Sequence, residues 1–386
     1  MITFSELNRI HIELSSACNA ACPVCPRNFR GGYTLPDLKI STMSLEKFKK
    51  IITPEVCQQI NQVVMCGVYG DPIYCKDLPS ILQYLHEQDP GIVITLNTNG
   101  GMRSTDWWSK LATANPNLLI NFSIDGLEDT NHIYRRNVKW KKLIENVTAY
   151  LENGGKAWWE FLIFKHNQHQ VDSARELAKS MGFESFTVKH PFGFEQVNGT
   201  LPRMEVLNTA GDFDYYIYPA DKENRNEMFD DTELSDVELT HFSPIDYKLH
   251  VDNFLKSKSE ILQNSLTDYK TLDNSEIDCM TKRVKEIYID SNGIVYPCCF
   301  FGPASDSNST DIQMQQYLEW RNSVITIDKI DASERPLKEI LDESGFLDSL
   351  EENWKKTHAC GKLMTCTSIC IKNYGVNSLY VNKETL

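Results

Sequence analysis

The sequence predicts an α/β fold with a mainly parallel sheet, because short apolar runs alternate with longer amphipathic segments over the first half of the chain. Two of the intervening segments, residues 139–153 and 171–181, carry apolar side chains at helical spacing and are each followed by a glycine. Strands that alternate with helices form right-handed βαβ units, which place the strands parallel. The pattern does not separate an open sheet from a barrel. Six runs are predicted to be strands: residues 10–14, 62–67, 92–97, 118–124, 158–164 and 185–189.

The alternation stops after about residue 195, so we predict a first domain over residues 1–195. Residues 196–275 contain the acidic run 221–236, and we expect a partly helical linker or an insertion that covers the substrate. A third pattern begins at residue 276. There residues 284–289 alternate like a strand, SNG at residues 291–293 is a tight-turn signal, and residues 294–296 give a return strand. Residues 276–386 are therefore expected to form a separate domain.

Composition and charge narrow the class of protein. An apolar content of 41% and a charged content of 24% over 386 residues are ordinary for a globular protein. The net charge of −14 argues against broad non-specific binding to nucleic acid or to an anionic membrane. No apolar run approaches the length of a membrane span, and the start MITFSELNRI has no signal-peptide core. We expect a cytoplasmic protein with neither a membrane nor a nucleic acid as partner.

Twelve cysteines are present, and their positions carry more information than their number. In a chain without an export signal we do not expect a disulfide framework, because the cytosol keeps thiols reduced. Cys57, Cys66 and Cys75 lie apart in apolar or helical settings, and we interpret them as core residues. The remaining cysteines form a front group and a back group: Cys18, Cys22 and Cys25, then Cys279, Cys298, Cys299, Cys360, Cys366 and Cys370.

The front group lies on the loop that leaves the first predicted strand, with three and then two residues between its members. Iron–sulfur clusters take thiolates in closely spaced runs of this kind, and three thiolates on one loop leave the fourth iron of a cubane open. A zinc site without its fourth ligand, or three unligated cysteines, are the alternatives. Structural zinc prefers four ligands, commonly as two CxxC pairs, and no adjacent His or Cys completes a set here.

The spacing of Cys18, Cys22 and Cys25 resembles the CxxxCxxC signature of the radical SAM superfamily. Further motifs follow the later predicted strands. GDP at residues 70–72 is similar to the family's GGE-type motif, which holds the methionine amino group of S-adenosylmethionine, with Asp71 in place of the usual glutamate. Taken alone, this glycine and acid also fit an ordinary βα turn. NTNG at residues 97–100 resembles the TNG found at this point in many relatives.

Two further pieces resemble the SxDG…HxxYR arrangement of the same family. NFSIDG at residues 121–126 ends the fourth predicted strand, and HIYRR at residues 132–136 follows it. The resemblance implies that the serine and the acid face the cofactor's ribose and that an arginine meets its carboxylate, as a guanidinium can. Helical phase lets one of the two arginines point inward, and the sequence leaves open which. The residues expected to bind the cofactor are Gly70, Asp71, Asn99, Ser123, Asp125, Arg135 and Arg136.

The resemblance implies a fold, a reaction and partners. The fold is a partial (β/α)6 barrel of the TIM type, with its chemistry at the carboxyl ends of the strands. The reaction is reductive cleavage of S-adenosylmethionine to a 5′-deoxyadenosyl radical that abstracts a substrate hydrogen, so we expect a radical SAM oxidoreductase. A donor such as flavodoxin or ferredoxin supplies the electron. One departure is Val24, since relatives usually carry an aromatic residue there.

The back group resembles a shortened SPASM domain, also called a twitch domain, of the same family. Thirteen residues separate Cys279 from Gly293, and four more separate this glycine from Cys298, as in the opening half of such a domain. The three cysteines of the second half also match it in spacing. Thr357 stands where the full pattern has a further cysteine, and no cysteine follows the last one. The second-half cysteines are Cys360, Cys366 and Cys370.

Two complete auxiliary clusters need about eight ligands, and the back group is too small for that. The resemblance therefore implies one auxiliary [4Fe–4S] cluster. Its expected ligands are Cys279, Cys298 and Cys370, with either Cys366 or Cys360 as the fourth. Cys299 is the spare, because an immediate neighbour of a ligand normally points away. A zinc ribbon is the alternative for this half, since a hairpin flanked by cysteines also suits zinc.

The resemblance does not name the substrate. Relatives with SPASM or twitch domains oxidise protein side chains, cross-link or epimerise peptides, or dehydrogenate small molecules. An auxiliary cluster can accept the electron left after hydrogen abstraction, which favours a net oxidation or bond formation. We expect oxidative modification or cross-linking of a peptide or protein, with dehydrogenation of a small amino-sugar or cyclitol as the alternative. A non-catalytic iron–sulfur protein for electron transfer or scaffolding is the alternative from another class.

Overall fold

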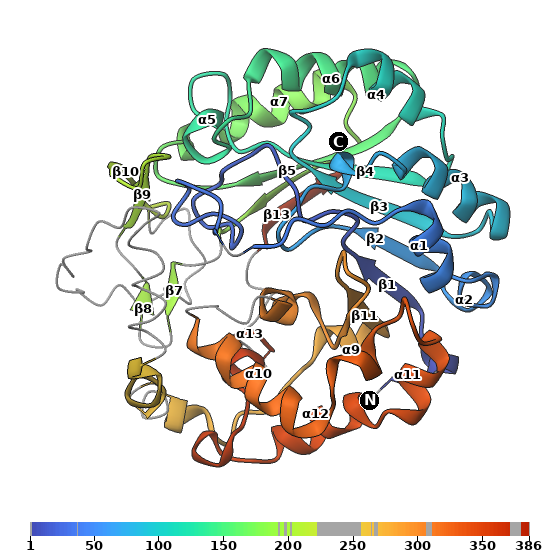
Figure 1. The fold of residues 1–386 in the computed structure, drawn as a ribbon. Coiled ribbons are helices and arrows are strands. Elements are labelled where there is room, and N and C mark those ends of the chain that lie inside the picture. The colour runs from blue at the N-terminus through green and yellow to red at the C-terminus, as the bar shows by residue number, and fades with distance from the viewer. Residues whose placement is uncertain are drawn as a thin grey trace.

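The computed structural model describes residues 2–36, 38–191, 194–196, 199–200, 203–221, 256–263, 265, 269–305, 311–370 and 380–385. Its main feature is one nine-stranded sheet, around which the helices are arranged (Figure 1). Listed across the sheet, the strands are β12 (Val295–Tyr296), β11 (Glu286–Ile289), β1 (Arg9–Ile12), β2 (Gln62–Met65), β3 (Val93–Thr98), β4 (Leu118–Ser123), β5 (Lys156–Leu162), β6 (Ser185–Lys189) and β13 (Tyr380–Thr385). β1 to β6 and the pair β1–β11 are parallel, whereas β12 and β13 are antiparallel to their neighbours.

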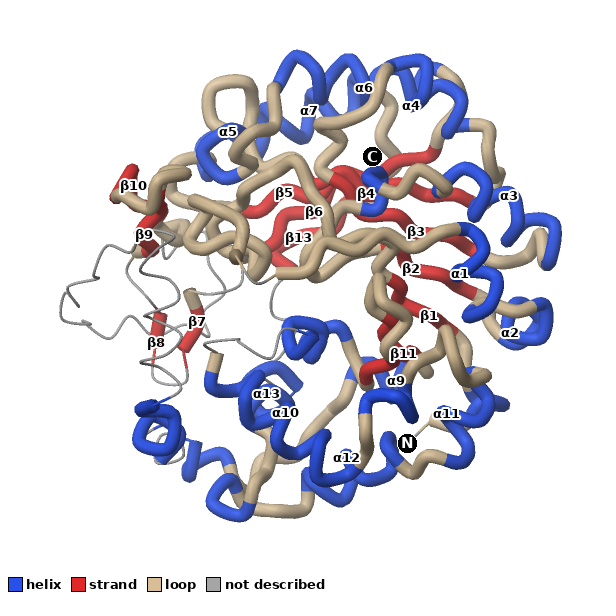
Figure 2. The backbone as a smooth tube through the Cα atoms, viewed as in Figure 1, coloured by secondary structure: helices blue, strands red, loops and turns tan. Residues whose placement is uncertain are grey.

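The helices fall into two groups along the chain, and Figure 2 shows them on different sides of the molecule. Those between β1 and β6 are α1 (Leu45–Ile51), α2 (Pro54–Gln59), α3 (Leu78–Gln88), α4 (Thr105–Ala112), α5 (Asn131–Tyr134), α6 (Trp140–Glu152) and α7 (Val171–Met181). Those after β10 (Phe213–Ile217) are α9 (Met280–Val284), α10 (Ile312–Val324), α11 (Leu337–Glu343), α12 (Phe346–Trp354) and α13 (Met364–Cys370). Short 3-10 turns are η1 (Phe4–Glu6), η2 (Pro72–Tyr74), η3 (Gln168–Gln170), η5 (Lys270–Leu272), η6 (Cys299–Ser305), η7 (Ile327–Ile330) and η8 (His358–Cys360).

The two faces of the sheet differ in polarity, because successive side chains of a strand point to opposite faces. One face carries buried apolar side chains that pack under the first group of helices: Ile10, Ile12, Ile94, Leu96, Ile120, Phe122, Trp159 and Phe161. Their neighbours on the other face are mostly polar. There the side chain of Gln62 donates to Thr95 at 3.2 Å, and Lys189 pairs with Glu160. The sheet therefore offers a polar face on the side away from those helices.

The six predicted strands are confirmed, and each overlaps one of the strands β1 to β6. The parallel order of these strands agrees with a partial barrel of the predicted kind. The predicted hairpin near residue 290 also forms, as β11 and β12. Pattern alone did not show that β11 joins the main sheet beside β1. This pairing is long-range, and an ion pair between Arg9 and Glu286 reinforces it.

Residues 196–275, expected as a partly helical linker or insertion, contain strands where the structure describes them. β9 (Met204–Leu207) and β10 form an antiparallel hairpin, and β7 (Glu195–Gln196) pairs with β8 (Gly199–Thr200). Residues 256–263 are helical. From residue 222 to residue 236 the predicted acidic run lies outside the described residues. The division of the chain into 1–195, 196–275 and 276–386 stays a prediction.

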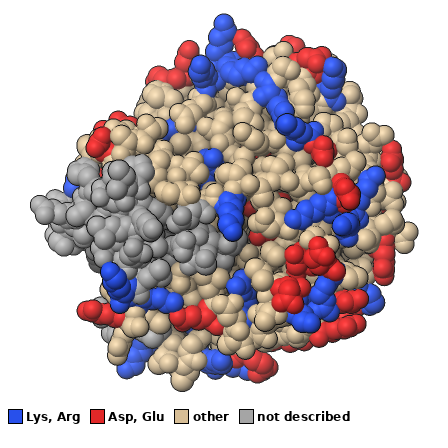
Figure 3. All heavy atoms as spheres, viewed as in Figure 1, with Lys and Arg blue, Asp and Glu red and all other residues tan. Residues whose placement is uncertain are grey.

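In the described part of the chain, no helix has both the length and the apolar character that crossing a membrane requires. Figure 3 shows Lys and Arg side chains interspersed with Asp and Glu side chains on the face that it draws, outside the grey residues. The expectation, drawn from the net charge of −14, that broad binding to nucleic acid is not favoured stays a prediction.

Phe122 tests the packing between the apolar face and its helices. Its ring lies 5.4 Å from that of Trp108 and 5.9 Å from that of Tyr150, between β4 and the helices α4 and α6. Phe122→Ala is expected to lower the free energy of unfolding by about 3–5 kcal/mol, because it leaves a cavity. Val93→Ala on β3, where the side chain is 45% exposed, is the control and should cost less than about 1 kcal/mol. Equal losses in urea denaturation would contradict this packing.

Candidate functional site

The three front cysteines lie on one compact loop after β1. Turns hold this loop, with the Cys25 amide donating to the Cys22 carbonyl at 3.1 Å. All three are free thiols, and Cys22 is buried, whereas Cys18 and Cys25 are half-buried. Burial, together with the neighbouring Cys22, raises the pKa of the Cys25 thiol to about 12. A bound cation reverses this effect by favouring thiolates, so the loop has the donor chemistry of a metal centre.

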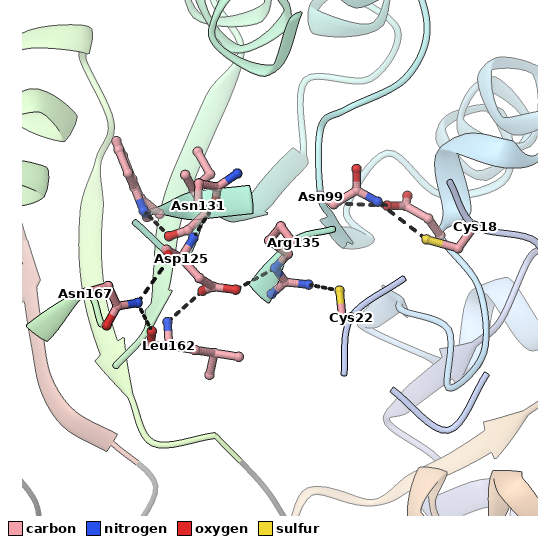
Figure 4. Close-up of polar contacts among 11 residues, drawn as sticks. Cys18, Cys22, Asn99, Asp125, Asn131, Arg135, Leu162 and Asn167 are labelled. Carbon is pink, nitrogen blue, oxygen red and sulfur yellow. Dashed lines mark hydrogen bonds and ion pairs between the residues drawn. The ribbon is translucent and has the colours of Figure 1, made fainter. Parts of the chain in front are cut away.

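Asp71 organises the polar groups beside Cys18. The buried carboxylate accepts hydrogen bonds from the backbone amide of Asn99 at 2.9 Å, from its side-chain amide at 2.8 Å, and from the Thr98 hydroxyl at 3.0 Å. The side-chain amide of Asn99 also lies 3.5 Å from the Cys18 sulfur, and it points toward that cysteine in Figure 4. Burial raises the pKa of Asp71 and these hydrogen bonds lower it. The structure thus brings the predicted Asp71 and Asn99 together at the cysteine loop.

Gly70 allows the loop that carries Asp71 to pack against the residues that follow β1. A Cβ atom at this position would lie 1.8 Å from the Ser15 carbonyl oxygen, so any other residue would push the two loops apart. The adjacent amide of Asp71 donates to the Ala17 carbonyl at 2.9 Å. Glycine at position 70 therefore permits a close approach of backbone to backbone, and its role in binding the cofactor stays a prediction.

Asp125 and Arg135 form a buried ion pair on the other side of the cysteine loop. The guanidinium Nε lies 2.5 Å from Asp125 Oδ2, and its Nη1 lies 3.7 Å from the Cys22 sulfur (Figure 4). The second carboxylate oxygen accepts from the Leu162 amide at 2.7 Å. Burial raises the pKa of Asp125, whereas Arg135 lowers it. Ser123 is the last residue of β4 and pairs in register with Glu160 on β5, on the polar face.

The structure separates the two arginines that the sequence left as alternatives. Arg135 faces the cysteine loop, as described above. Arg136 points away from that loop to the β9–β10 hairpin, where it donates to the Leu207 carbonyl at 2.9 Å and pairs with Asp214 at 2.9 Å. Consecutive residues at the end of α5 thus serve different neighbours, because their side chains leave the backbone in different directions.

Sequence reasoning missed the role of the β9–β10 hairpin. Glu205 of β9 forms a 2.5 Å ion pair with Arg30 of the loop that follows the front cysteines, and the Leu207 amide donates to the Arg30 carbonyl at 3.0 Å. Tyr215 of β10 donates to the Ile133 carbonyl at 2.5 Å. The hairpin therefore fastens the cysteine loop to α5. No local pattern shows this, because both contacts cross more than 80 residues of chain.

Four of the back cysteines line one cavity. The sulfur-bearing residues on its wall are Cys279, Cys298, Cys366 and Cys370. Cys366 and Cys370 come from the same face of α13, because they are four residues apart on a helix. Burial, together with nearby Cys279, raises the pKa of the Cys370 thiol to about 12. The other walls are mainly apolar, with Phe301, Leu350, Trp354 and Ile369 among them.

The remaining two cysteines of the back group do not line this cavity. Cys360 is exposed at the end of η8. Cys299 follows Cys298 directly, and its nearest charged and thiol neighbours include Glu286 and Cys66. Within the described residues, no three His, Cys, Asp or Glu side chains converge closely enough to hold a single metal ion. The four thiols therefore line a common cavity but do not converge on a single position within it.

His358 holds α13 in place beneath that cavity. Its Nδ1 lies 2.6 Å from Asp273 Oδ1 and its Nε2 lies 2.9 Å from the Thr367 hydroxyl. The order acid, imidazole and hydroxyl resembles a nucleophilic triad. Thr367, however, is completely buried, and its hydroxyl bonds to the Leu363 and Met364 carbonyls of its own helix. We therefore interpret the three residues as structural support for Cys366 and Cys370.

Glu13 is a further residue that sequence reasoning missed, although an acid in the apolar run IHIEL is a visible signal. Its side chain is 1% exposed and follows β1 directly. Oε1 accepts from the amides of Tyr69 and Gly70 at 2.9 and 2.8 Å, and Oε2 accepts from the Tyr288 hydroxyl at 2.9 Å. Burial raises the pKa of this carboxyl to about 7 against the opposing effect of the hydrogen bonds.

Glu13→Gln tests this environment through pH. Because the pKa is about 7 in the folded state and 4.5 is the ordinary value, the folded protein binds the proton more tightly. The free energy of unfolding should therefore fall between pH 4.5 and 7 in the wild type relative to the variant, by roughly 2–4 kcal/mol. Glu152→Gln, an exposed carboxyl on α6, controls for loss of one charge. A difference that stays constant with pH would contradict the assignment; urea denaturation at several pH values measures it.

The chain matches known proteins in sequence over one segment and in fold over most of its length. Residues 12–181 match the family model of the radical SAM superfamily. SuiB of Streptococcus suis bound to S-adenosylmethionine has a TM-score of 0.52 at 14% identity, over 94% of this chain and 73% of that chain. SuiB bound to the precursor peptide SuiA has a TM-score of 0.52 at 14% identity, over 94% of this chain and 72% of that chain. Histidine-tagged anSMEcpe with bound AdoMet has a TM-score of 0.50 at 15% identity, over 94% of this chain and 86% of that chain. No curated protein matches the chain.

At these identities the structural likeness concerns the fold. The family match concerns a defined segment, which contains all three front cysteines and the residues that surround them. The Asp71–Asn99 network and the Asp125–Arg135 pair both fall inside it. Residues 12–181 of this chain match the radical SAM superfamily, and the described chain shares its fold with solved proteins that bind S-adenosylmethionine.

Proposed function

We propose that the protein is a radical SAM enzyme that cleaves S-adenosylmethionine reductively and abstracts a hydrogen from its substrate. The observation that carries this proposal is the position of Cys18, Cys22 and Cys25 between two buried polar networks, those of Asp71 and Arg135. A [4Fe–4S] cluster bound by the three thiolates would supply an open iron for the cofactor and the electron for its cleavage. An external donor such as flavodoxin or ferredoxin would supply that electron.

The surrounding residues would position the cofactor. We assign Arg135, rather than Arg136, to the cofactor carboxylate, because its guanidinium is the one that faces the cysteine loop. Asp125 has both carboxylate oxygens engaged, by Arg135 and by the Leu162 amide, so its role would be to orient Arg135 rather than to meet the ribose. Ser123 remains the proposed ribose contact. Asp71 would fix Asn99 and its own loop, with Gly70 allowing the close approach.

We propose that the back cavity would hold one auxiliary [4Fe–4S] cluster in a domain of the twitch type. A cubane is larger than a single ion, so four thiols spaced around a cavity suit it. Tetrahedral zinc would draw four sulfurs to about 2.3 Å from one point. The proposed ligands are Cys279, Cys298, Cys366 and Cys370, which selects Cys366 over Cys360. Such a cluster would take up the electron left on the substrate and favour a net oxidation.

A peptide or protein is the proposed substrate, to be modified oxidatively or cross-linked. Two observations support it. The polar face of the sheet carries Glu160 and Lys189 in the carboxyl-terminal halves of β5 and β6, where charged groups would meet a polar chain. SuiB, whose fold this chain shares, has been solved with its precursor peptide SuiA. The alternative of an amino-sugar or cyclitol stays a prediction.

The first test is formation of 5′-deoxyadenosine. Anaerobically reconstituted and reduced protein is expected to cleave S-adenosylmethionine to this product, measured by chromatography. Cys22→Ala removes a cluster thiolate and should abolish the product. Cys57→Ala, a buried core cysteine on α2, is the matched control and should retain activity. Protein that carries its full iron and sulfide yet forms no 5′-deoxyadenosine would contradict the enzyme and favour the electron-transfer alternative.

The second test separates the two candidates for the fourth auxiliary ligand. Cys366→Ala should lower the bound iron from about eight to about four per chain, because the auxiliary cluster loses a ligand from inside the cavity. Cys360→Ala, at the exposed position, should leave the iron unchanged. Iron and sulfide assays measure both variants. The reverse order of effects would overturn the ligand set, and one zinc per chain in the wild type would point to a zinc ribbon.

A further inference from the structure

Glu13 stands at a junction between the two cysteine sites. It follows β1, and its backbone amide donates to the Ile289 carbonyl of β11 at 2.9 Å. Its carboxylate lies beneath the loop that carries Gly70 and Asp71, where Oε1 accepts the two amides of Tyr69 and Gly70. These two amides lie immediately before Asp71, so the carboxylate sets the position of that loop from below.

The second oxygen of Glu13 reaches the C-terminal part of the chain. It accepts from the hydroxyl of Tyr288, a completely buried residue of β11. The Tyr288 ring lies between those of His11 and Tyr296, with ring centroids 5.0 and 5.9 Å away. One carboxylate therefore joins β11, which leads through the hairpin to Cys298, with the loop that precedes Asp71.

Packing between these parts is close. A Cβ atom at Gly302, in the turn after Cys298, would lie 2.7 Å from Val68 Cγ2 and 2.9 Å from Tyr288 Cε1. Val68 belongs to the same loop as Tyr69 and Gly70. The loop is thus held by two kinds of contact from the C-terminal part, a hydrogen-bond relay through Glu13 and direct packing against the turn of η6.

We propose that Glu13 and Tyr288 are positioning residues for the S-adenosylmethionine site, through which the C-terminal hairpin sets the affinity for the cofactor. This inference rests on the proposed function. Glu13 holds the Tyr69 and Gly70 amides, and Tyr288 holds Glu13 in the orientation that reaches them. A carboxylate that loses one of three donors in a buried setting is free to turn, and the loop that it supports then shifts.

The experiment uses the reconstituted holoenzyme and measures three properties: the Kd for S-adenosylmethionine, the constants KM and kcat for its reductive cleavage, and the electron paramagnetic resonance of the reduced front cluster with and without cofactor. Tyr288→Phe removes only the hydroxyl and should raise the Kd and KM about fivefold, with kcat at saturating cofactor within about twofold. Tyr296→Phe is the matched control, because its hydroxyl on the same hairpin faces Asp290 at 3.3 Å instead of Glu13. Tyr296→Phe should leave the Kd and the KM unchanged.

Two substitutions of Glu13 complete the test, one that removes the hydrogen-bond acceptor and one that keeps it. Glu13→Ala should raise the Kd by more than about tenfold, because both loop amides lose their acceptor. Glu13→Gln keeps an oxygen for the amides and a donor toward the Tyr288 oxygen, so its Kd should stay within about twofold of the wild type. The inference is overturned if Tyr288→Phe behaves like Tyr296→Phe, if Glu13→Gln is as weak as Glu13→Ala, or if iron content or kcat falls in place of affinity. Wild-type holoenzyme that neither binds nor cleaves S-adenosylmethionine would instead overturn the proposed function.

Discussion

The site depends on how closely the loop before Asp71 approaches the exit of β1. Gly70 allows backbone to meet backbone there, since a Cβ atom would lie 1.8 Å from the Ser15 carbonyl oxygen. This contact places Asp71 beside the cysteine loop, and Asp71 in turn holds Asn99 near Cys18. Three segments that follow β1, β2 and β3 are thus joined at the carboxyl ends of parallel strands, where α/β proteins gather their chemistry. A larger residue at position 70 would separate all three.

The C-terminal part of the chain contributes to the front site as well as to its own. β11 extends the sheet beside β1, and its Tyr288 reaches Glu13 under the Asp71 loop. On the opposite flank the β9–β10 hairpin fastens the cysteine loop through the Arg30–Glu205 ion pair. Both contacts are buried or half-buried, so they gain from a low local dielectric. A front site built from residues 12–181 alone would lack these two supports.

Local patterns predicted much of the fold and part of the candidate site. β1 to β6 were predicted because apolar runs of strand length alternate with helical periodicity, a property of each segment by itself. Spacing also placed the front cysteines on a loop after a strand. It did not identify a role for Glu13. An acid at the end of a buried strand has no evident function until its three hydrogen-bond donors are known, and these come from distant segments. Nor did it find the hairpin, whose partners lie more than 70 residues away in sequence.

The sequence by itself determined the positions of the six parallel strands along the chain and the grouping of the cysteines, since both follow from periodicity and spacing. Only the tertiary structure decided which side chains meet. It turned Arg135 toward Cys22 and Arg136 toward Asp214, and it placed Cys366 in the back cavity while leaving Cys360 exposed. The physical reason is the same in both cases. The direction of a side chain at the end of a short helix or turn is set by the distant segments packed against it, and spacing along the chain does not encode them.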